Sequence, residues 1–259
     1  MPRGFESENR VSFLPFGACG YILGRMLILG HRGVCGKGVA ENSLAAVAAA
    51  LEAGADGVEI DVRVAKDGVV LLAHDRVCVF GANGERKEVV PASQSASLRE
   101  LGLASLDELF SFLREQRTVR GEVPFLNVEL KDVGSAKVVA ARVRQALAEG
   151  WPEERLLISS FGPHALKALE RALPPATLGI IADACVEDLP RVARRNGWGN
   201  VVLNAEWATP EVVAQGRKEG LGVWVWAPDD PELLREMFAL PLSGVIVDDP
   251  ALARRVWQE

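Results

Sequence analysis

From Met26 onward, short apolar runs alternate along the chain with stretches whose apolar positions recur at helical spacing. Short apolar or β-branched runs bounded by turn residues are typical of strands, and the longer periodic stretches are typical of helices. The predicted strands are Leu27–Gly30, Val58–Val62, Pro124–Lys131, Leu156–Ser160, Leu178–Ala182, Asn200–Asn204, Gly222–Trp226 and Gly244–Asp248. The predicted helices are 42–54, 105–117, 135–149, 163–172, 187–196 and three that begin at Pro210, Pro231 and Pro250.

Eight strands, each followed by a helix, predict an α/β fold that closes into a (β/α)8 TIM barrel. An open, doubly wound sheet is the alternative. The first strand-to-helix turn, HRGVCGKG, contains glycines, but they do not have the GxGxxG spacing of a dinucleotide site. We therefore expect a single TIM-barrel domain over residues 26–259.

The second predicted strand carries two acids on one face. Glu59 and Asp61 alternate with Val58 and Ile60, so both carboxylates project from the same side, about 7 Å apart along the strand. If they are buried, they repel each other unless a cation or protons lie between them. A surface strand with charged positions is the simpler interpretation of this pair alone.

A β-hairpin is predicted directly after this strand. The dipeptide Asp67-Gly68 lies between two apolar extended runs and predicts a two-residue loop, in which Lys66 pairs with Val69. In that register Asp61 faces His74, which places an imidazole beside the acids. The hairpin is an excursion from the barrel, because so short a connection cannot make a parallel crossover. After it we expect a short irregular insertion, residues 76–104, with turns at Gly81, 83–84 and Pro91.

The composition suits an ordinary soluble globular protein. The 259 residues are 49% hydrophobic and 25% charged, and the formal net charge of −6 argues against a non-specific nucleic-acid binder. No run of apolar residues reaches the length of about 18 that a membrane-spanning helix needs. The four cysteines show no metal-binding spacing, so we expect reduced thiols.

The first 25 residues fit neither the barrel nor a signal peptide. Glu6 and Glu8 oppose a basic leader region, and Met26 directly precedes the first apolar run. We expect residues 1–25 to be a poorly ordered extension and the protein to be cytoplasmic. The alternative is an exported protein anchored by a lipid on Cys19, because 16–19 weakly resembles a lipoprotein cleavage site.

In a barrel of this type, functional residues lie at the carboxyl ends of the strands. Two of the three histidines in the chain fall there. The set collected at these ends is His31, Arg32, Glu59, Asp61, His74, Glu129, Lys131, Phe161, Asn204, Trp226 and Asp248. Phe161 and Trp226 could equally be rim packing, and Asn204 and Asp248 are expected to be hydrogen-bonding residues at strand ends.

The residue types in this set suit phosphodiester cleavage. Three carboxylates, Glu59, Asp61 and Glu129, are typical ligands for a hard divalent cation such as Mg²⁺ or Ca²⁺. A neighbouring arginine and lysine suit a phosphate. Two histidines can then serve as general acid and base, one activating the attacking hydroxyl and the other protonating the leaving alkoxide. The simpler interpretations are a loop-capping histidine and arginine and an ion pair at a strand end.

The motifs HRG, ENS, EIDV, KDG, HD, VELK, SSF and VWVW occur in this order from about Leu27 to Pro250. In this order they resemble the glycerophosphodiester phosphodiesterases. The resemblance implies a metal-dependent barrel enzyme that hydrolyses small-molecule glycerophosphodiesters to sn-glycerol 3-phosphate and an alcohol. It implies acid–base roles for His31 and His74 and phosphate binding by Arg32. The implied metal ligands are Glu59, Asp61 and Glu129, with Glu41 and Lys131 lining the same site.

The sequence also departs from the family pattern. Ala40, Ser43 and Ala65 replace a proline and two threonines, and RVCVFGANGERKEV follows Asp75. These changes leave the catalytic groups in place but alter the region where glycerol or the leaving alcohol would bind. Two alternatives therefore stay open: a phospholipase-type enzyme that releases a cyclic phosphate, and a catalytically silent barrel that binds phosphodiesters or a partner protein. The sequence gives no indication of the oligomeric state.

Overall fold

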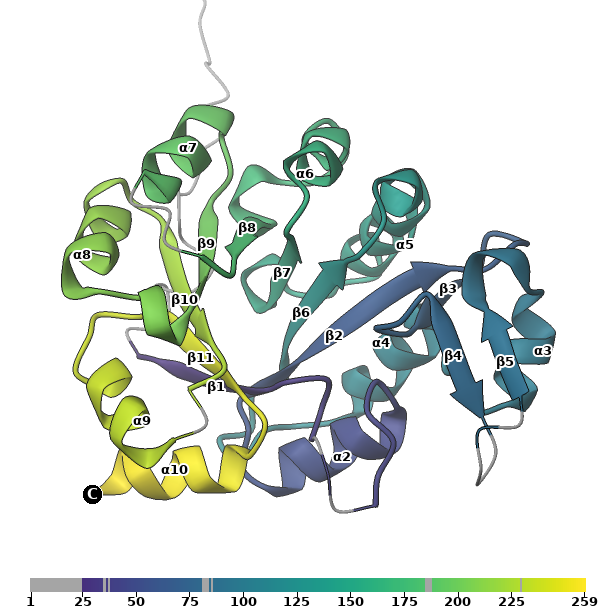
Figure 1. Cartoon of the computed structure of the whole chain (residues 1–259), viewed down its shortest axis with the longest axis horizontal. Coiled ribbons are helices and arrows are strands. Elements are labelled where there is room, and N and C mark those ends of the chain that lie inside the picture. Colours follow the sequence, from purple (N-terminus) through teal and green to yellow (C-terminus); the bar gives the residue numbers. More distant parts are fainter. Residues whose placement is uncertain are drawn as a thin grey trace, which may run out of the picture.

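The computed structural model describes residues 25–34, 36, 38–80, 84, 86–184, 188–228 and 230–259. Its main sheet has the order β1-β11-β10-β9-β8-β7-β6-β2-β3, and a further pairing of β1 with β2 closes it into a barrel (Figure 1). The parallel barrel strands are β1 Leu27–Gly30, β2 Gly57–Val64, β6 Phe125–Leu130, β7 Leu156–Ser160, β8 Leu178–Ala182, β9 Asn200–Asn204, β10 Gly222–Trp226 and β11 Gly244–Val247. The predicted (β/α)8 fold is confirmed.

Helices surround this barrel, and local sequence signals set where they begin. They are α2 Leu44–Glu52, α4 Leu106–Glu115, α5 Ala136–Ala148, α6 Pro163–Leu169, α7 Leu189–Asn196, α8 Pro210–Lys218, α9 Pro231–Phe238 and α10 Pro250–Gln258. Ser105 and Glu108 form a reciprocal capping box at the start of α4. Short 3-10 helices are η1 Val90–Ala92, η2 Val133–Ser135, η3 Glu153–Arg155, η4 Pro175–Thr177 and η5 Ala205–Trp207.

The barrel has two apolar layers. The larger lies between the strands and the helices, and the smaller fills the barrel interior. The interior layer contains Leu27, Leu29, Phe125, Leu157, Ile181, Val202, Trp224 and Ile246. A Cβ at Gly244 would lie 2.6 Å from the ring of Trp224, so glycine is needed there for the ring to fit. This interior layer forms the floor on which the polar site rests.

The hairpin after β2 exists, but its predicted register is wrong by one residue. Strand β3, Val70–Leu72, pairs with β2 so that Val62 lies opposite Leu72. Ala73 donates its amide to the carbonyl of Asp61, so Ala73 and not His74 faces Asp61. The loop has three residues because Gly68 adopts a left-handed φ of +84° and its amide bonds to Ala65. His74 lies beyond the end of β3.

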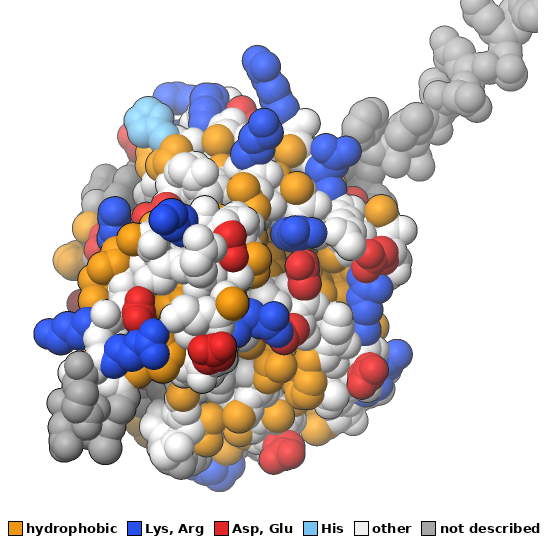
Figure 2. Space-filling model, turned by 90° about the vertical axis from the view of Figure 1, so that its right-hand side faces the viewer, with side chains coloured by type: hydrophobic (Ala, Val, Ile, Leu, Met, Phe, Trp, Pro, Cys, Tyr) orange, Lys and Arg blue, Asp and Glu red, His pale blue; other side chains and the backbone are white. Residues whose placement is uncertain are grey.

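The insertion expected to be irregular contains regular structure. Strands β4, Val77–Phe80, and β5, Arg86–Val89, form a separate two-stranded sheet, and α3, Ser95–Glu100, follows. Together they lie outside the ring of barrel helices, beside β3 and α4 (Figure 1). A small apolar cluster that includes Leu71, Val90 and Leu98 attaches them to the hairpin. Figure 2 shows the face on this side, where acidic and basic side chains are interspersed and apolar side chains reach the surface between them.

Two expectations concern parts of the chain that are not described. Residues 1–24, which include Cys19, lie outside the described residues, as do Gly81 and Asn83 of the expected turns.

Among the described residues, Cys78 is a free thiol. Within the described part of the chain, none of the helices is both long and apolar enough to span a membrane. Arg25, the first described residue, forms an ion pair with Glu122.

Candidate active site

A cavity of about 160 Å³ opens at the carboxyl ends of the barrel strands. Most of the side chains predicted for the site meet there. Its lining consists of His31, Arg32, Glu59, His74, Asn127, Glu129, Lys131, Phe161, Ile181, Val202, Trp226 and Ile246. Asp61 lies below the lining, almost completely buried, and Glu41 lies outside this cavity and reaches it through its ion pair with Arg32. Ile181, Val202 and Ile246 belong to the interior layer and Trp226 packs against it, so the cavity has a polar side and an apolar side.

The three predicted metal ligands converge. Parallel pairing of β2 with β6 places Asp61 beside Glu129, and Glu59 lies one alternation back on β2. One carboxylate oxygen from each residue lies within 4.8 Å of the others, close enough to share a metal ion. The Oε1 atom of Glu59 is buried without a hydrogen-bond partner. A buried carboxylate oxygen without a donor is unfavourable, and a hard divalent cation would satisfy it.

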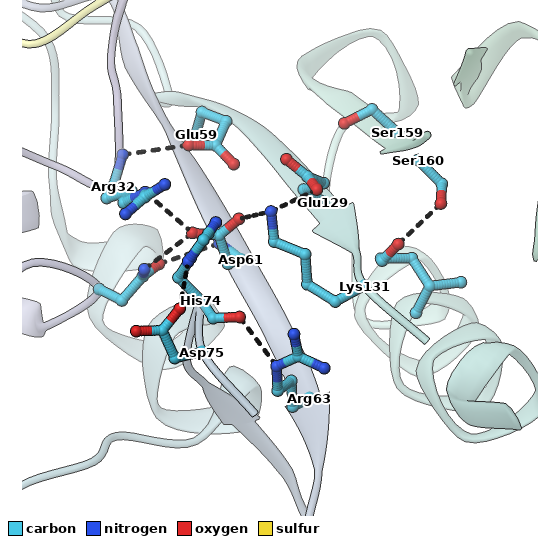
Figure 3. A network of polar contacts seen from close by, with 12 residues as sticks. Arg32, Glu59, Asp61, Arg63, His74, Asp75, Glu129, Lys131, Ser159 and Ser160 are labelled. Carbon is cyan, nitrogen blue, oxygen red and sulfur yellow. Dashed lines mark hydrogen bonds and ion pairs between the residues drawn. The ribbon is translucent and has the colours of Figure 1, made fainter. Parts of the chain in front are cut away.

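Two cations partly neutralise this acidic group (Figure 3). The Nζ atom of Lys131 lies 2.8 Å from Oδ1 of Asp61 and 2.5 Å from Oε1 of Glu129. The Nε atom of Arg32 lies 3.2 Å from Oδ2 of Asp61. Asp61 is therefore the best-neutralised acid of the three, and Glu59 is the least.

The pKa values follow this division. Burial and the charge of Asp61 raise the pKa of Glu59 to about 8. Burial and Asp61 likewise raise the pKa of Glu129, although Lys131 opposes the shift. For Asp61 itself, burial acts to raise the pKa, but Lys131 and a hydrogen bond from Asn42 outweigh it and lower the pKa below its usual value. A further positive charge beside Lys131 and Arg32 would favour the ionised forms of Glu59 and Glu129.

The HRG and ENS motifs form the wall beside β2. Arg32 and Asn42 both have a left-handed φ of 52°, which is unusual for residues with a side chain. In this conformation the Arg32 amide donates to Oε2 of Glu59 at 3.1 Å, while its guanidinium donates to Glu41. This left-handed conformation allows Arg32 to bond to the buried carboxylate of Glu59 through its backbone while its side chain lines the cavity.

Asn42 is a site residue outside the predicted set, because an asparagine at the start of a predicted helix is equally typical of an N-cap. Ser43 takes the cap of α2, and its hydroxyl accepts from the amide of Ala46. The side chain of Asn42 instead bonds to Asp61 at two points. Its Nδ2 donates to Oδ2 of Asp61 at 2.9 Å, and its Oδ1 accepts from the backbone amide of Asp61 at 2.9 Å. This two-point contact fixes the orientation of Asp61.

His31 is held by a carboxylate. Its Nδ1 lies 2.7 Å from Oδ1 of Asp248, just after β11, and its Nε2 lies 4.0 Å from Glu59. Burial lowers the pKa of His31, but the hydrogen bond to Asp248 and the charges of Glu59 and Asp248 outweigh it, so the pKa lies above its ordinary value. Asp248, expected only as a hydrogen-bonding residue at a strand end, is therefore the orienting partner of His31.

His74 is held from two sides. Its Nδ1 lies 2.8 Å from Oδ1 of Asp75, and its backbone carbonyl accepts from Nε of Arg63 at 2.8 Å (Figure 3). The Arg63 guanidinium also bonds to Asp132, after β6, at 2.7 Å. Arg63 therefore ties the turn that carries His74 to the barrel. The predicted register of the hairpin gives no indication of this hydrogen bond from Arg63, because the carbonyl that accepts it lies beyond the last paired residues of the hairpin.

The apolar side of the cavity contains Phe161 and Trp226, which pack edge-on with their ring centroids 6.2 Å apart. Lys131 lies 6.0 Å from the centroid of Phe161. The side-chain oxygen of Asn127 accepts from Ser159, and its side-chain nitrogen is buried without a hydrogen-bond partner. No sequence motif indicated Asn127. Asn204 is not part of this lining; its side chain caps η5 by accepting from the amide of Glu206.

The comparisons with known proteins agree on one family. The model of the glycerophosphoryl diester phosphodiesterase family matches residues 31–252. A curated glycerophosphodiester phosphodiesterase from Caldanaerobacter subterraneus subsp. tengcongensis is 29% identical over 241 residues, which cover 87% of this chain and 95% of that protein.

Two solved structures share the fold. A glycerophosphodiester phosphodiesterase from Thermotoga maritima is 27% identical, with a TM-score of 0.72, over 90% of this chain and 98% of that one. An Oleispira antarctica phosphodiesterase, solved in complex with the product sn-glycerol-3-phosphate, has a TM-score of 0.78 at 20% identity, over 93% of this chain and 99% of that one. Since the family model covers most of the chain, the protein belongs to the glycerophosphoryl diester phosphodiesterase family and is an enzyme of that family.

Proposed function

We propose that the enzyme hydrolyses glycerophosphodiesters to sn-glycerol 3-phosphate and an alcohol, with Mg²⁺ or Ca²⁺ held by Glu59, Asp61 and Glu129. The observation that carries the proposal is the convergence of this acidic group with two carboxylate-paired histidines in one cavity. The relative from Oleispira antarctica, whose structure contains sn-glycerol-3-phosphate, supports the identity of the product.

The family depends on a divalent metal, and the donor set of this site fits one. All three candidate ligands are carboxylates, which favour a hard cation over zinc. In addition, Oε1 of Glu59 is buried without a hydrogen-bond partner. When bound, the cation would neutralise the charge that develops on the phosphoryl oxygens. Arg32 and Lys131 would bind the same phosphate from the cavity wall, and the unpartnered amide nitrogen of Asn127 would donate to a substrate oxygen.

The two histidines would move the protons. One takes a proton from the attacking oxygen as that oxygen bonds to phosphorus, and the other gives a proton to the leaving oxygen as its bond to phosphorus breaks. Asp248 would orient His31, and Asp75 would orient His74, through the hydrogen bonds at their Nδ1 atoms. Each Nε2 is then the atom available for proton transfer. Phe161 and Trp226 would pack against the glycerol carbons.

Release of glycerol 3-phosphate from glycerophosphocholine and glycerophosphoethanolamine tests the proposal. Each substrate is assayed with EDTA, with added Mg²⁺ and with added Ca²⁺, and the phosphorus product is identified by ³¹P NMR. We expect no release in EDTA and recovery with one of the cations. A cyclic phosphate as the final product would overturn direct hydrolysis in favour of the phospholipase-type reaction. Failure of a folded, metal-loaded sample to cleave any glycerophosphodiester would overturn the proposed activity altogether.

A further inference from the structure

A second cavity, of about 340 Å³, lies next to the first, and His74 lines both. Its walls come from the residues before α2, the turn after β3, strand β4 and the segment after α3. Most of this lining is therefore supplied by the insertion, residues 76–104, and by the turn that precedes it. Because His74 lines both cavities, the second cavity lies beside one of the two histidines that the proposed hydrolysis uses.

Apart from the thiol of Cys78, the side chains that the insertion contributes to this lining are apolar. They are Val79 and Phe80 of β4 together with Leu101 and Leu103 after α3. Val79 is 56% exposed, and Val77 and Val89 of the same two-stranded sheet are exposed as well. Covering such side chains with an apolar group would remove apolar surface from water.

Two carboxylates also border the second cavity, but both are engaged. Glu41 forms an ion pair with Arg32, and Asp75 forms a hydrogen bond with His74. An ammonium group in the cavity would have to compete with these partners. The lining therefore suits an uncharged apolar group better than a cationic one.

Resting on the proposed phosphodiester hydrolysis, we propose that the second cavity binds the leaving alcohol and that this alcohol carries an apolar chain. The bond between phosphorus and the leaving oxygen breaks, and that oxygen takes a proton from Nε2 of His74, so a neutral alcohol remains in the second cavity. The glycerol phosphate half stays in the first cavity with Arg32 and Lys131. In this arrangement His74 is the general acid, and His31 is the base that takes a proton from the attacking water.

A series of synthetic glycerophosphodiesters tests the alcohol preference. The leaving alcohols are ethanol, 1-hexanol and choline, and kcat/KM is measured for each with the metal-loaded enzyme. We expect the hexyl ester to exceed the ethyl ester by at least about tenfold, because several methylenes enter an apolar site. Equal values for the ethyl and hexyl esters, or a preference for the choline ester, would overturn the inference while leaving the proposed hydrolysis intact. Failure to cleave any of the three would overturn both.

Paired substitutions on β4 test whether the preference for the hexyl ester arises in the second cavity. Val79 lines the second cavity, whereas Val77, on the same strand and also exposed, does not. We expect Val79→Asn to lower kcat/KM for the hexyl ester by about fivefold and to reduce the hexyl-to-ethyl ratio. Val77→Asn, the matched control, should leave that ratio unchanged. Because asparagine is uncharged, neither variant alters the field at His74, and an unchanged ratio in both variants would overturn the placement of the alcohol.

Discussion

Two tryptophans on one strand divide the barrel interior into a lower and an upper part. Trp224 and Trp226 lie two residues apart on β10, so their side chains point to the same face. Trp224 is completely buried, packs against Phe125 and donates its Nε1 to Asn200 at 3.0 Å. Trp226 lines the cavity and packs edge-on against Phe161, which is 42% exposed. Trp224 therefore belongs to the packed lower part of the interior, whereas Trp226, on the same face of the strand, borders the candidate site in the upper part.

The levels differ in how their polar groups are satisfied. Around Trp224 the packing is apolar, and the Nε1 of Trp224 and the side chain of Asn200 are both hydrogen-bonded. At the upper level, buried acids of like charge face one another, and Oε1 of Glu59 has no hydrogen-bond partner. Burying such groups costs free energy, and proteins tolerate that cost at sites that bind or react. The comparison implies that changes at the upper level should affect activity, whereas changes at the lower level should affect stability.

The largest expected effect is at the upper level. We predict that His31→Ala or His74→Ala lowers kcat for glycerol 3-phosphate release by about 10²- to 10⁴-fold, because each removes a proton-transfer group. The unfolding temperature should stay close to that of the wild type. His164→Ala is the matched control, because His164 is the remaining histidine and lies exposed on α6. Wild-type turnover in either cavity variant would rule out the acid–base assignment.

The complementary change is at the lower level. Trp224→Ala should cost about 3–5 kcal/mol of stability, because it opens a large cavity in the interior layer and leaves Oδ1 of Asn200 without its donor. Trp226→Ala should cost about 1 kcal/mol, because its side chain is partly exposed, and it should mainly raise KM. Urea unfolding followed by circular dichroism gives both free energies of unfolding. Similar losses for the two variants would contradict the division of the interior.

A pH dependence separates the acids from the rest of the fold. The raised pKa of Glu59, about 8, exceeds that of an unfolded glutamate, so its contribution to stability is present below about pH 4.5 and is lost as the pH rises towards 8. Glu129 and His31 also have raised pKa values and act in the same direction. Asp61 has a lowered pKa, so its contribution changes at more acidic pH. In EDTA, the unfolding temperature should therefore fall between about pH 5 and pH 8.

Glu59→Gln provides the control for this dependence, because glutamine fills the same space without titrating. In EDTA, we expect the variant to show a shallower fall in unfolding temperature than the wild type over the same pH range. Added Mg²⁺ or Ca²⁺ should stabilise the wild type most at the alkaline end, where the acids are ionised, and should stabilise the variant less. Identical pH curves for the two proteins in EDTA would show that Glu59 does not titrate in this range.

Much of the barrel was predictable because its signals are local. Strands β7, β8, β9 and β10 begin and end at the predicted residues, since each is a short buried run bounded by turn residues. Prolines and capping residues marked the helix starts, as at Ser105. The hairpin register was missed because Asp67-Gly68 fits both a two-residue and a three-residue loop. The conformation of Gly68 and its bond to Ala65, which sequence does not encode as a pattern, decide between them.

The site was predictable where strand order alone brings residues together. Glu59, Asp61 and Glu129 meet because β2 and β6 are neighbours in any barrel of this topology. Residues whose contacts depend on loop conformation were not predictable in this way. Asn42 reaches Asp61 only because its own backbone is left-handed, and the sequence equally permits it to cap a helix.

Arg63 is the clearest case of this kind, and its loss should lower the rate less than the loss of either histidine. Its guanidinium bonds to the His74 carbonyl and to Asp132, so it positions the turn without touching the cavity. Arg63→Ala should lower kcat by about tenfold with little change in KM, because a misplaced histidine affects proton transfer more than substrate binding. Arg63→Lys keeps the charge but not the planar fork, and it should recover only part of the rate.

Two measurements distinguish positioning by Arg63 from a general role in stability. The matched control is Arg86→Ala, which removes an exposed arginine whose ion pair with Glu88 lies on the insertion. If Arg63 acts through His74, the variant changes kcat and the pH profile of kcat more than the unfolding temperature, because the histidine alone has moved. A fall in unfolding temperature with an unchanged kcat for the folded fraction would instead assign Arg63 to the fold. Arg63 would then be a structural residue like Trp224, although it lies close to the cavity.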